Sequence, residues 1–152
     1  MNTFTPSTGN LYLVVGYDGS APAVRALDTA VSLMRDREGS IEVFYVAHLS
    51  SAEMLSPDAI AEMEGSFDEI ARDLREQAAE QLRGREERWT FGRGQGPITG
   101  DLIAAAERIR EAHPDDNVAI VVGSSSQATH RLLGSVAVNL ARHAPVPLLI
   151  VP

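Results

Sequence analysis

The sequence predicts one α/β domain with a parallel sheet that is covered by helices on both faces. Five short apolar segments alternate with amphipathic segments of helical spacing, and this alternation is typical of such a fold. The length of 152 residues suits a single domain. We assign residues 11–152 to this domain, whereas residues 1–10 are polar and are expected to form a flexible N-terminal arm.

The first predicted unit is a strand, a helix and a second strand. Residues 11–16 form an apolar run that suits a strand buried on both faces, and residues 41–47 form the second strand. Between them, Asp18 and Gly19 lie in a turn, and Ser20 is suited to cap a helix. Apolar residues recur along this helix at helical spacing, namely Val24, Leu27, Ala30, Val31 and Met34. Two strands joined in this way should be parallel, with a right-handed crossover.

A second, longer helix is expected to start after Ser56. Ser56 is suited to cap it, Pro57 fits its first position, and Asp58 is favoured at the positive end of the helix dipole. Its apolar stripe consists of Ile60, Met63, Phe67, Ile70, Leu74, Ala78 and Leu82. Such a stripe usually faces the core, and the alternative is a surface for a partner protein.

The second half of the chain continues the alternation. Residues 89–91 alternate like a strand with one apolar face, and the glycine-rich residues 92–97 are expected to form a loop. A third helix is expected to open at Thr99 or Gly100, and a proline-containing break at residues 114–117 ends it. The remaining elements are predicted as a strand at 118–122, a helix at 135–144 and a strand at 146–151.

Composition and charge exclude several functions. The formal net charge is −8, from 13 basic and 21 acidic residues, and an acidic surface repels phosphodiester backbones, so we expect no nucleic-acid partner. The chain has no lysine, which excludes a Walker A loop, and no cysteine, which excludes disulfides and thiolate metal sites. No apolar run approaches ~18 residues and the first residues do not resemble a signal peptide, so we expect no membrane partner and a cytoplasmic location.

Two loops form the candidate binding site. In open parallel sheets, ligands bind beyond the carboxyl ends of the strands, near the point where the strand order reverses. Residues 17–20 and residues 123–134 follow the two strands that are expected to be central. The second loop leads into a helix that begins near Ser135, and the free amides at a helix N-terminus suit an anion. We therefore expect a ligand between these two loops.

With these loops, the chain resembles the universal stress protein family over nearly all of residues 11–152. The resemblance rests on VVGYDGSAPAVRALDTA, on FYVAH at the end of the second strand, on VVGSSS and on LLGSVAVNLARHAPVPLLIVP. It implies a Rossmann-like, five-stranded parallel sheet of order 3-2-1-4-5. It also implies a homodimer through the last strand, Pro147–Val151, where an exposed apolar sheet edge needs a partner.

The ATP-binding branch of that family implies a set of site residues. By this resemblance, Asp18 contacts the nucleoside, backbone groups near Val46 meet adenine, and Gly123, Gly134 and Ser135 belong to the phosphate loop. ATP or AMP is the implied ligand, with Mg²⁺ only if a triphosphate is bound. Asp18 has an alternative interpretation, which is an Asx-turn that caps the following helix without a ligand.

The phosphate loop departs from the family pattern at its second glycine. Ser126 stands there, and only seven residues separate it from Gly134. A serine in the left-handed conformation costs roughly 1–2 kcal/mol, and a shorter loop shortens the arc that must wrap a triphosphate. Ser124 and Ser126 add hydroxyl donors. His130 and Arg131 in this loop either contact a phosphate or are solvated.

Two functions remain open. The first is a regulatory module that binds an adenine nucleotide, and the second is a dimeric interaction protein that binds no nucleotide. An enzyme is less favoured, with weak ATP hydrolysis at most, because the sequence has no G-x-S-x-G elbow, no H-E-x-x-H motif and no base placed to activate a nucleophile. His48, His113 and His143 lack ligand spacing, so no metal site is expected. The sequence does not specify the protein partner.

Overall fold

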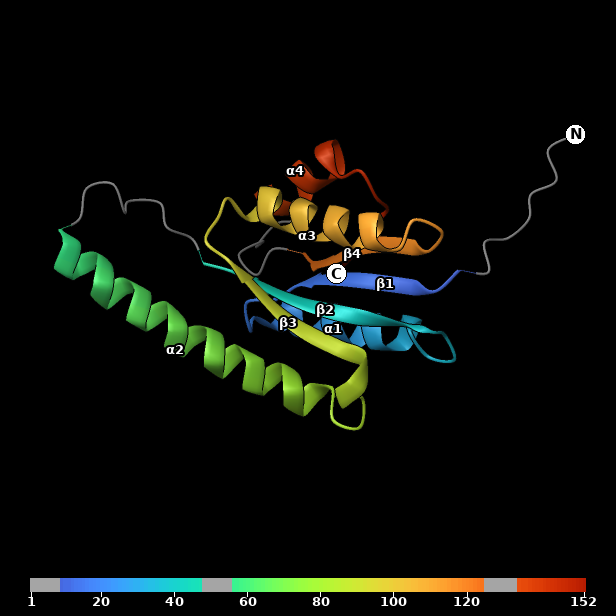
Figure 1. The fold of residues 1–152 in the computed structure, drawn as a ribbon, viewed down its shortest axis with the longest axis horizontal. Coiled ribbons are helices and arrows are strands. Elements are labelled where there is room, and N and C mark those ends of the chain that lie inside the picture. Colours follow the sequence, from blue (N-terminus) through green and yellow to red (C-terminus); the bar gives the residue numbers. More distant parts are fainter. Residues whose placement is uncertain (1–8, 48–55, 125–133) are drawn as a thin grey trace, which may run out of the picture.

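A five-stranded parallel sheet lies at the centre of the computed structural model, which describes residues 9–47, 56–124 and 134–152 (Figure 1). The strand order β3-β2-β1-β4-β5 confirms the predicted topology, and all four strand pairs are parallel. The elements are β1 (Leu11–Gly16), α1 (Ala21–Leu33), β2 (Gly39–Val46), α2 (Pro57–Gln81), a short 3₁₀ helix (Glu86–Arg88), β3 (Trp89–Gly94), α3 (Ile98–Ala112), β4 (Asn117–Gly123), α4 (Ser135–His143) and β5 (Leu148–Val151).

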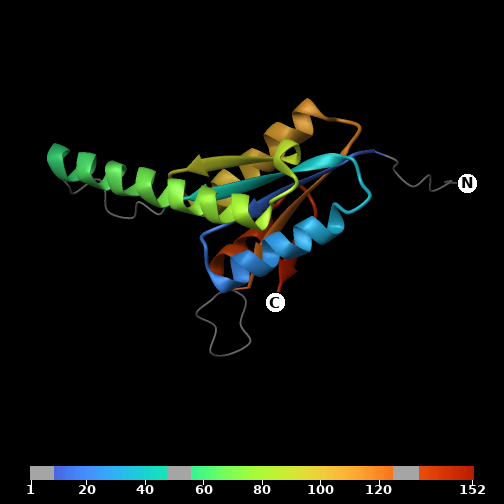
Figure 2. The same ribbon diagram turned by 90° about the horizontal axis from the view of Figure 1, so that it is seen from below.

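Helices cover both faces of the sheet (Figures 1 and 2). α1 and α2 pack on the face to which Leu13 and Val15 of β1 contribute, and α3 and α4 pack on the face to which Val14 contributes. These three side chains are at most 2% exposed, which explains why the central strand is apolar throughout. None of the helices in the described ranges is long and apolar enough to cross a membrane.

Ser20 and Ser56 cap the first two helices, as predicted. The Ser20 Oγ accepts a hydrogen bond from the Ala23 amide, and the Ser56 Oγ accepts one from the Ala59 amide, each at 3.3 Å. A proline lies in the first turn of each helix. A backbone N–H group at this position would have no acceptor within the helix, so proline, which lacks the N–H group, is tolerated there. Local sequence therefore sets where both helices begin.

The third strand is longer than predicted. We expected a loop over residues 92–97, but β3 continues to Gly94. Pairing with β2, in which Gly92 lies opposite Phe44 and Gly94 opposite Val46, supplies backbone hydrogen bonds that outweigh the local preference of glycine for loops.

Several other element boundaries differ by one or two residues from the prediction, as helix and strand ends often do; β2 is observed at Gly39–Val46, β4 at Asn117–Gly123, and α4 ends at His143. α3 begins at Ile98 rather than at residues 99–100. β5 begins at Leu148 rather than at residue 146, because Pro147 has no N–H group to donate to a strand ladder.

A buried carboxylate in the sheet was not predicted. Glu42 lies in the middle of β2 and is 9% exposed. Its two carboxylate oxygens accept hydrogen bonds from the Nη2 of Arg108 in α3, at 2.9 and 3.3 Å. This ion pair offsets the desolvation cost of placing a charge in the sheet.

The predicted N-terminal arm falls mostly outside the described residues. The Asn10 amide donates a hydrogen bond to the Asp116 Oδ1 at 2.9 Å, and the Asn10 carbonyl accepts one from the Asn117 amide at 2.9 Å. The last residue of the predicted arm is therefore attached to the turn before β4.

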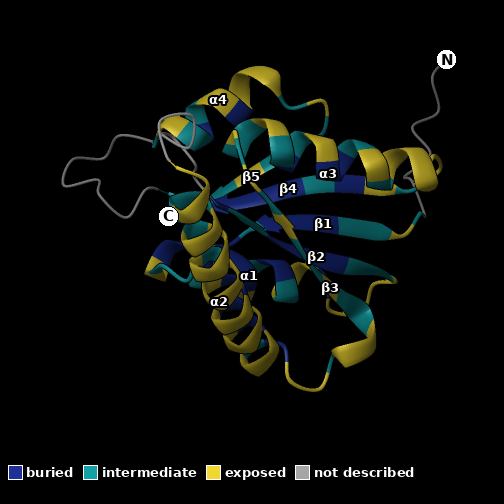
Figure 3. Ribbon diagram, turned by 60° about the vertical axis from the view of Figure 1, so that its left-hand side comes forward, coloured by how far each residue is buried: buried dark blue, intermediate teal, exposed yellow. Residues whose placement is uncertain are grey.

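The apolar stripe of α2 is covered along only part of its length (Figure 3). Its C-terminal half is buried at Ala71, Leu74 and Ala78. In its N-terminal half, Ile60, Met63 and Phe67 are half-buried, and Ile70 is 42% exposed. The expectation that the stripe faces the core is therefore correct for the C-terminal half alone.

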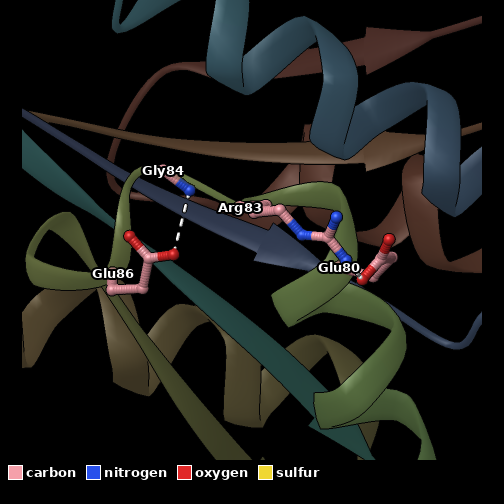
Figure 4. A network of polar contacts seen from close by, with 4 residues as sticks. All are labelled: Glu80, Arg83, Gly84 and Glu86. Carbon is pink, nitrogen blue, oxygen red and sulfur yellow. Dashed lines mark hydrogen bonds and ion pairs between the residues drawn. The ribbon is translucent and has the colours of Figure 1, made fainter.

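Polar contacts hold the chain where α2 ends (Figure 4). The Gly84 amide donates a hydrogen bond to the Glu86 Oε1 at 2.9 Å, and Arg83 forms an ion pair with Glu80. The hydrogen bond from Gly84 lowers the pKa of the Glu86 carboxyl because it favours the charged form. The chain turns here from α2 toward β3, and Gly84 adopts a φ of +88° in this turn.

We predict opposite effects for alanine at two glycines. Gly39 has a φ of +130°, and a Cβ there would lie 1.8 Å from the Leu11 carbonyl oxygen, so Gly39→Ala should lower the free energy of unfolding by more than about 2 kcal/mol. Gly65 lies in α2, and a Cβ added there would have no atom within 4 Å, so Gly65→Ala should raise it by roughly 0.5–1 kcal/mol. Urea denaturation measures both, and equal effects would contradict the prediction.

Candidate functional site

A cavity of about 230 Å³ opens at the carboxyl ends of β1, β2 and β4. It lies between the turn at residues 17–20 and the start of α4, where the strand order reverses and where the topology predicts a ligand. Of the predicted site residues, those that line it are Asp18, Val46, Gly123, Ser124, Gly134 and Ser135. The structure thus brings together residues from four separate parts of the chain.

Asp18 lies at the rim of the cavity, directly after β1. Its Oδ1 accepts a hydrogen bond from the Ser20 amide at 2.9 Å, so the Asx-turn considered from the sequence is present. The side chain is exposed, and a carboxylate has two oxygens that each accept more than one hydrogen bond. The turn therefore positions Asp18 and leaves acceptor capacity for a ligand hydroxyl.

The end of β2 forms one wall of the cavity. Phe44 and Val46 line this wall. The Phe44 carbonyl accepts a hydrogen bond from the Tyr17 amide at 2.9 Å, and this bond holds the turn that carries Asp18 against β2. Apolar walls with a few polar groups at fixed positions are typical of small-molecule sites.

The end of β4 forms the opposite wall. A Cβ at Gly123 would lie 2.5 Å from the carbonyl carbon and oxygen of Pro22, so the close approach of β4 to α1 requires glycine at this position. The Ser124 amide donates a hydrogen bond to the Val151 carbonyl at 2.7 Å. That amide is therefore already used, and Ser124 can offer a ligand its hydroxyl.

The N-terminus of α4 is the part of the predicted phosphate loop best suited to an anion. Gly134 is the N-cap and has no side chain to cap the helix. The first amides of a helix have no partner within the helix, and here those of Ser135 and Val136 belong to residues that line the cavity. Ser126 and His130, the other predicted residues of this loop, lie outside the described residues.

Several aromatic and apolar lining residues were not named as site residues in the prediction. Tyr17 belongs to the predicted loop at residues 17–20, and Tyr45 adjoins the predicted Val46 in the sequence, which is the signal that could have identified it. Ile98 and Leu102 come from the first turns of α3. No local pattern marks these two residues, because they reach the cavity only through the packing of α3 on the sheet.

Both tyrosines at the cavity remain neutral near pH 7. Burial raises the pKa of the Tyr17 hydroxyl above its ordinary value of 10.0, and the Asp18 and Asp28 carboxylates raise it further. Burial and Asp18 also raise the pKa of Tyr45, against the opposing effect of Arg93. These residues therefore supply aromatic surface rather than charge.

The charge of the lining restricts the kind of ligand. Asp18 is the one charged side chain among the described residues that line the cavity. Within the same described ranges, no group of three or more histidine, aspartate and glutamate residues could hold a metal ion. The arrangement therefore suits a ligand with an uncharged body and an anionic group directed at α4.

Stability should decrease at alkaline pH. Because the pKa of Tyr17 is raised by folding, the folded protein holds this proton more tightly than the unfolded chain does above about pH 10. The free energy of unfolding should therefore fall as the pH rises from about 10 toward the folded-state pKa, and Tyr17→Phe should reduce this slope. Urea denaturation from pH 8 to 11 tests this, and identical slopes for the two proteins would contradict it.

Comparison with solved structures gives the same fold. UspA from Lactobacillus plantarum superposes with a TM-score of 0.74 at 18% identity, over 95% of this chain and 99% of that chain. A universal stress protein from Archaeoglobus fulgidus in complex with dAMP gives 0.57 at 17% identity, over 95% and 98% of the two chains. A universal stress protein in complex with cAMP gives 0.56 at 22% identity, over 93% and 97%.

Comparison with protein families identifies the chain more directly. A search of curated proteins gives no match. The family model described as the universal stress protein family matches residues 12–152, which include all five strands except the first residue of β1. The chain therefore belongs to the universal stress protein family.

Proposed function

We propose that the protein is a regulatory module that binds an adenine nucleotide at the carboxyl ends of β1 and β4. The observation that carries this proposal is the cavity in which Asp18, Val46 and the N-terminus of α4 come together. Asp18 accepts a hydrogen bond from a ribose hydroxyl, the wall formed by β2 contacts the adenine ring, and the α4 amides bind phosphate. Solved structures of the same fold that are described as complexes with cAMP and dAMP support this choice of ligand.

The charge of the lining favours AMP over ATP. The described lining residues offer the N-terminus of α4 to an anion and include no cationic side chain. AMP places its one phosphate group at that helix end, whereas ATP brings two further phosphates whose charge needs neutralisation. Mg²⁺ neutralises such phosphates in many sites, so we expect a requirement for Mg²⁺ only with the triphosphate.

Calorimetry should show saturable binding of AMP with a Kd below about 1 mM. Asp18→Ala should weaken this binding about tenfold or more, because a hydrogen bond to a charged group contributes about 1.5–3 kcal/mol. Asp115→Ala is the matched control, since Asp115 is exposed in the turn before β4, at the opposite end of the sheet.

Two outcomes would count against the nucleotide site. The absence of saturable binding of AMP, cAMP and ATP would favour the interaction protein that binds no nucleotide. Equal weakening of AMP binding by Asp18→Ala and Asp115→Ala would contradict the assignment of Asp18 as a contact of the nucleotide.

We also propose that the protein forms a homodimer through β5. This strand is an edge of the sheet, and Leu149 on it is 37% exposed. An exposed apolar edge strand readily pairs with another chain. Pairing of β5 with its own copy about a two-fold axis would give a closed, isologous interface.

Light scattering should give twice the mass of one chain for the unmodified protein. Leu149→Arg should reduce the mass to that of one chain, because it places two like charges close to the two-fold axis. Leu33→Arg is the matched control, since Leu33 in α1 has a similar exposure of 41%. A single-chain mass for the unmodified protein at the highest concentration measured would contradict the dimer.

A further inference from the structure

α2 carries a large share of the net negative charge of the protein. It contains eight acidic and two basic residues, while the formal net charge of the whole chain is −8. Its N-terminal half, residues 57–70, contains five acidic residues and no basic residue. Most of the net charge of α2 therefore lies on its N-terminal half.

The same half of α2 presents an apolar stripe beyond the sheet. The first turns of α2 extend past the ends of the strands in two views (Figures 1 and 2). The stripe that is buried at Leu74 and Ala78 continues at helical spacing through Ile70 and Phe67 to Met63. Along this stretch Met63 and Phe67 are half-buried, and Ile70 is 42% exposed.

The acidic residues beside this stripe are largely without cations. Asp68 forms an ion pair with Arg93 of β3, and farther along the helix Glu80 pairs with Arg83 (Figure 4). Within the described part of the chain, the side chains of Glu62 and Glu64 have no such partner. At 100° per residue, Glu62 and Glu64 fall on opposite sides of the stripe.

We infer that the N-terminal half of α2 is a docking site for a basic amphipathic helix of a partner protein. The apolar face of such a helix covers Met63 and Ile70, and its lysine or arginine residues pair with Glu62 and Glu64. A second copy of this chain is a poor occupant, because it brings the same acidic helix and a net charge of −8. The inference does not depend on nucleotide binding.

The test uses the full chain and a labelled synthetic peptide of about 18 leucine and lysine residues with one apolar helical face. Fluorescence anisotropy should show saturable binding that weakens at higher salt concentration. The double variant Glu62→Gln/Glu64→Gln should weaken it about fivefold, through the loss of two exposed ion pairs. Ile70→Ser should weaken it by a similar factor of about five, through the loss of apolar contact.

Matched controls separate docking from general attraction to an acidic protein. Glu87→Gln/Glu111→Gln removes two exposed acidic side chains elsewhere, and Leu33→Ser changes a leucine of 41% exposure on α1; both should leave the affinity unchanged. A peptide of the same composition without an apolar face should bind at least about fivefold more weakly.

Three results would overturn the inference. They are absence of peptide binding, equal binding of the two peptides, and equal weakening by the control and test variants. A self-associated form that is lost in Ile70→Ser would also overturn it, because the occupant would then be a second copy. If Ile70→Ser does not fold, the double glutamine variant still decides the question, since both of its substitutions are on the exposed surface.

Discussion

The pairing of β1 with β4 is the constraint on which the binding end of the molecule depends. β1 lies between β2 and β4, so the strand order reverses at this pair and the chain leaves the two strands toward opposite faces. α1 then packs on one face and α4 on the other, and the cavity lies between the turn that precedes α1 and the N-terminus of α4. Val15 and its partner Val121 are fully buried, and the residues that follow them, Gly16 and Val122, line the cavity, so the core packing of this strand pair positions part of the lining.

The parts of the fold that could be predicted from the sequence are those set by neighbouring residues. Ser20 and Ser56 cap helices through amides three residues ahead, so their roles are visible in a short window. The extent of β3 and the burial of Glu42 are set by residues that are distant in the sequence. Gly94 extends β3 because it pairs with Val46, and Glu42 is tolerated in the sheet because Arg108, 66 positions away, supplies a cation.

The residues of the candidate site also fall into those that could be predicted from the sequence and those that depend on tertiary packing. Asp18 and Gly123 follow two predicted central strands, and the rule that parallel strands deliver their carboxyl ends to one edge was enough to group them, whereas Val46 was added by the resemblance to the universal stress protein family. Ile98 and Leu102 could not be grouped with them, because their place at the cavity follows from how α3 packs on the sheet. The sequence thus predicts the residues that a strand end delivers to such a site better than the residues that reach it through the packing of a helix on the sheet.

The proposed nucleotide site and the proposed partner surface are connected through α2, because α2 packs against the turn that carries Asp18. A Cβ added at Gly19 would lie 2.7 Å from Leu74 Cδ2 and 3.1 Å from Gln77 Oε1, and both atoms belong to α2. The turn therefore lies close to α2, so a ligand that shifts this turn would change its packing on α2, and the far half of α2 is the proposed partner surface. If the partner prefers the position that α2 takes when the nucleotide is bound, the nucleotide increases the affinity for the partner. Thermodynamic linkage then requires that the partner increase the affinity for the nucleotide by the same factor.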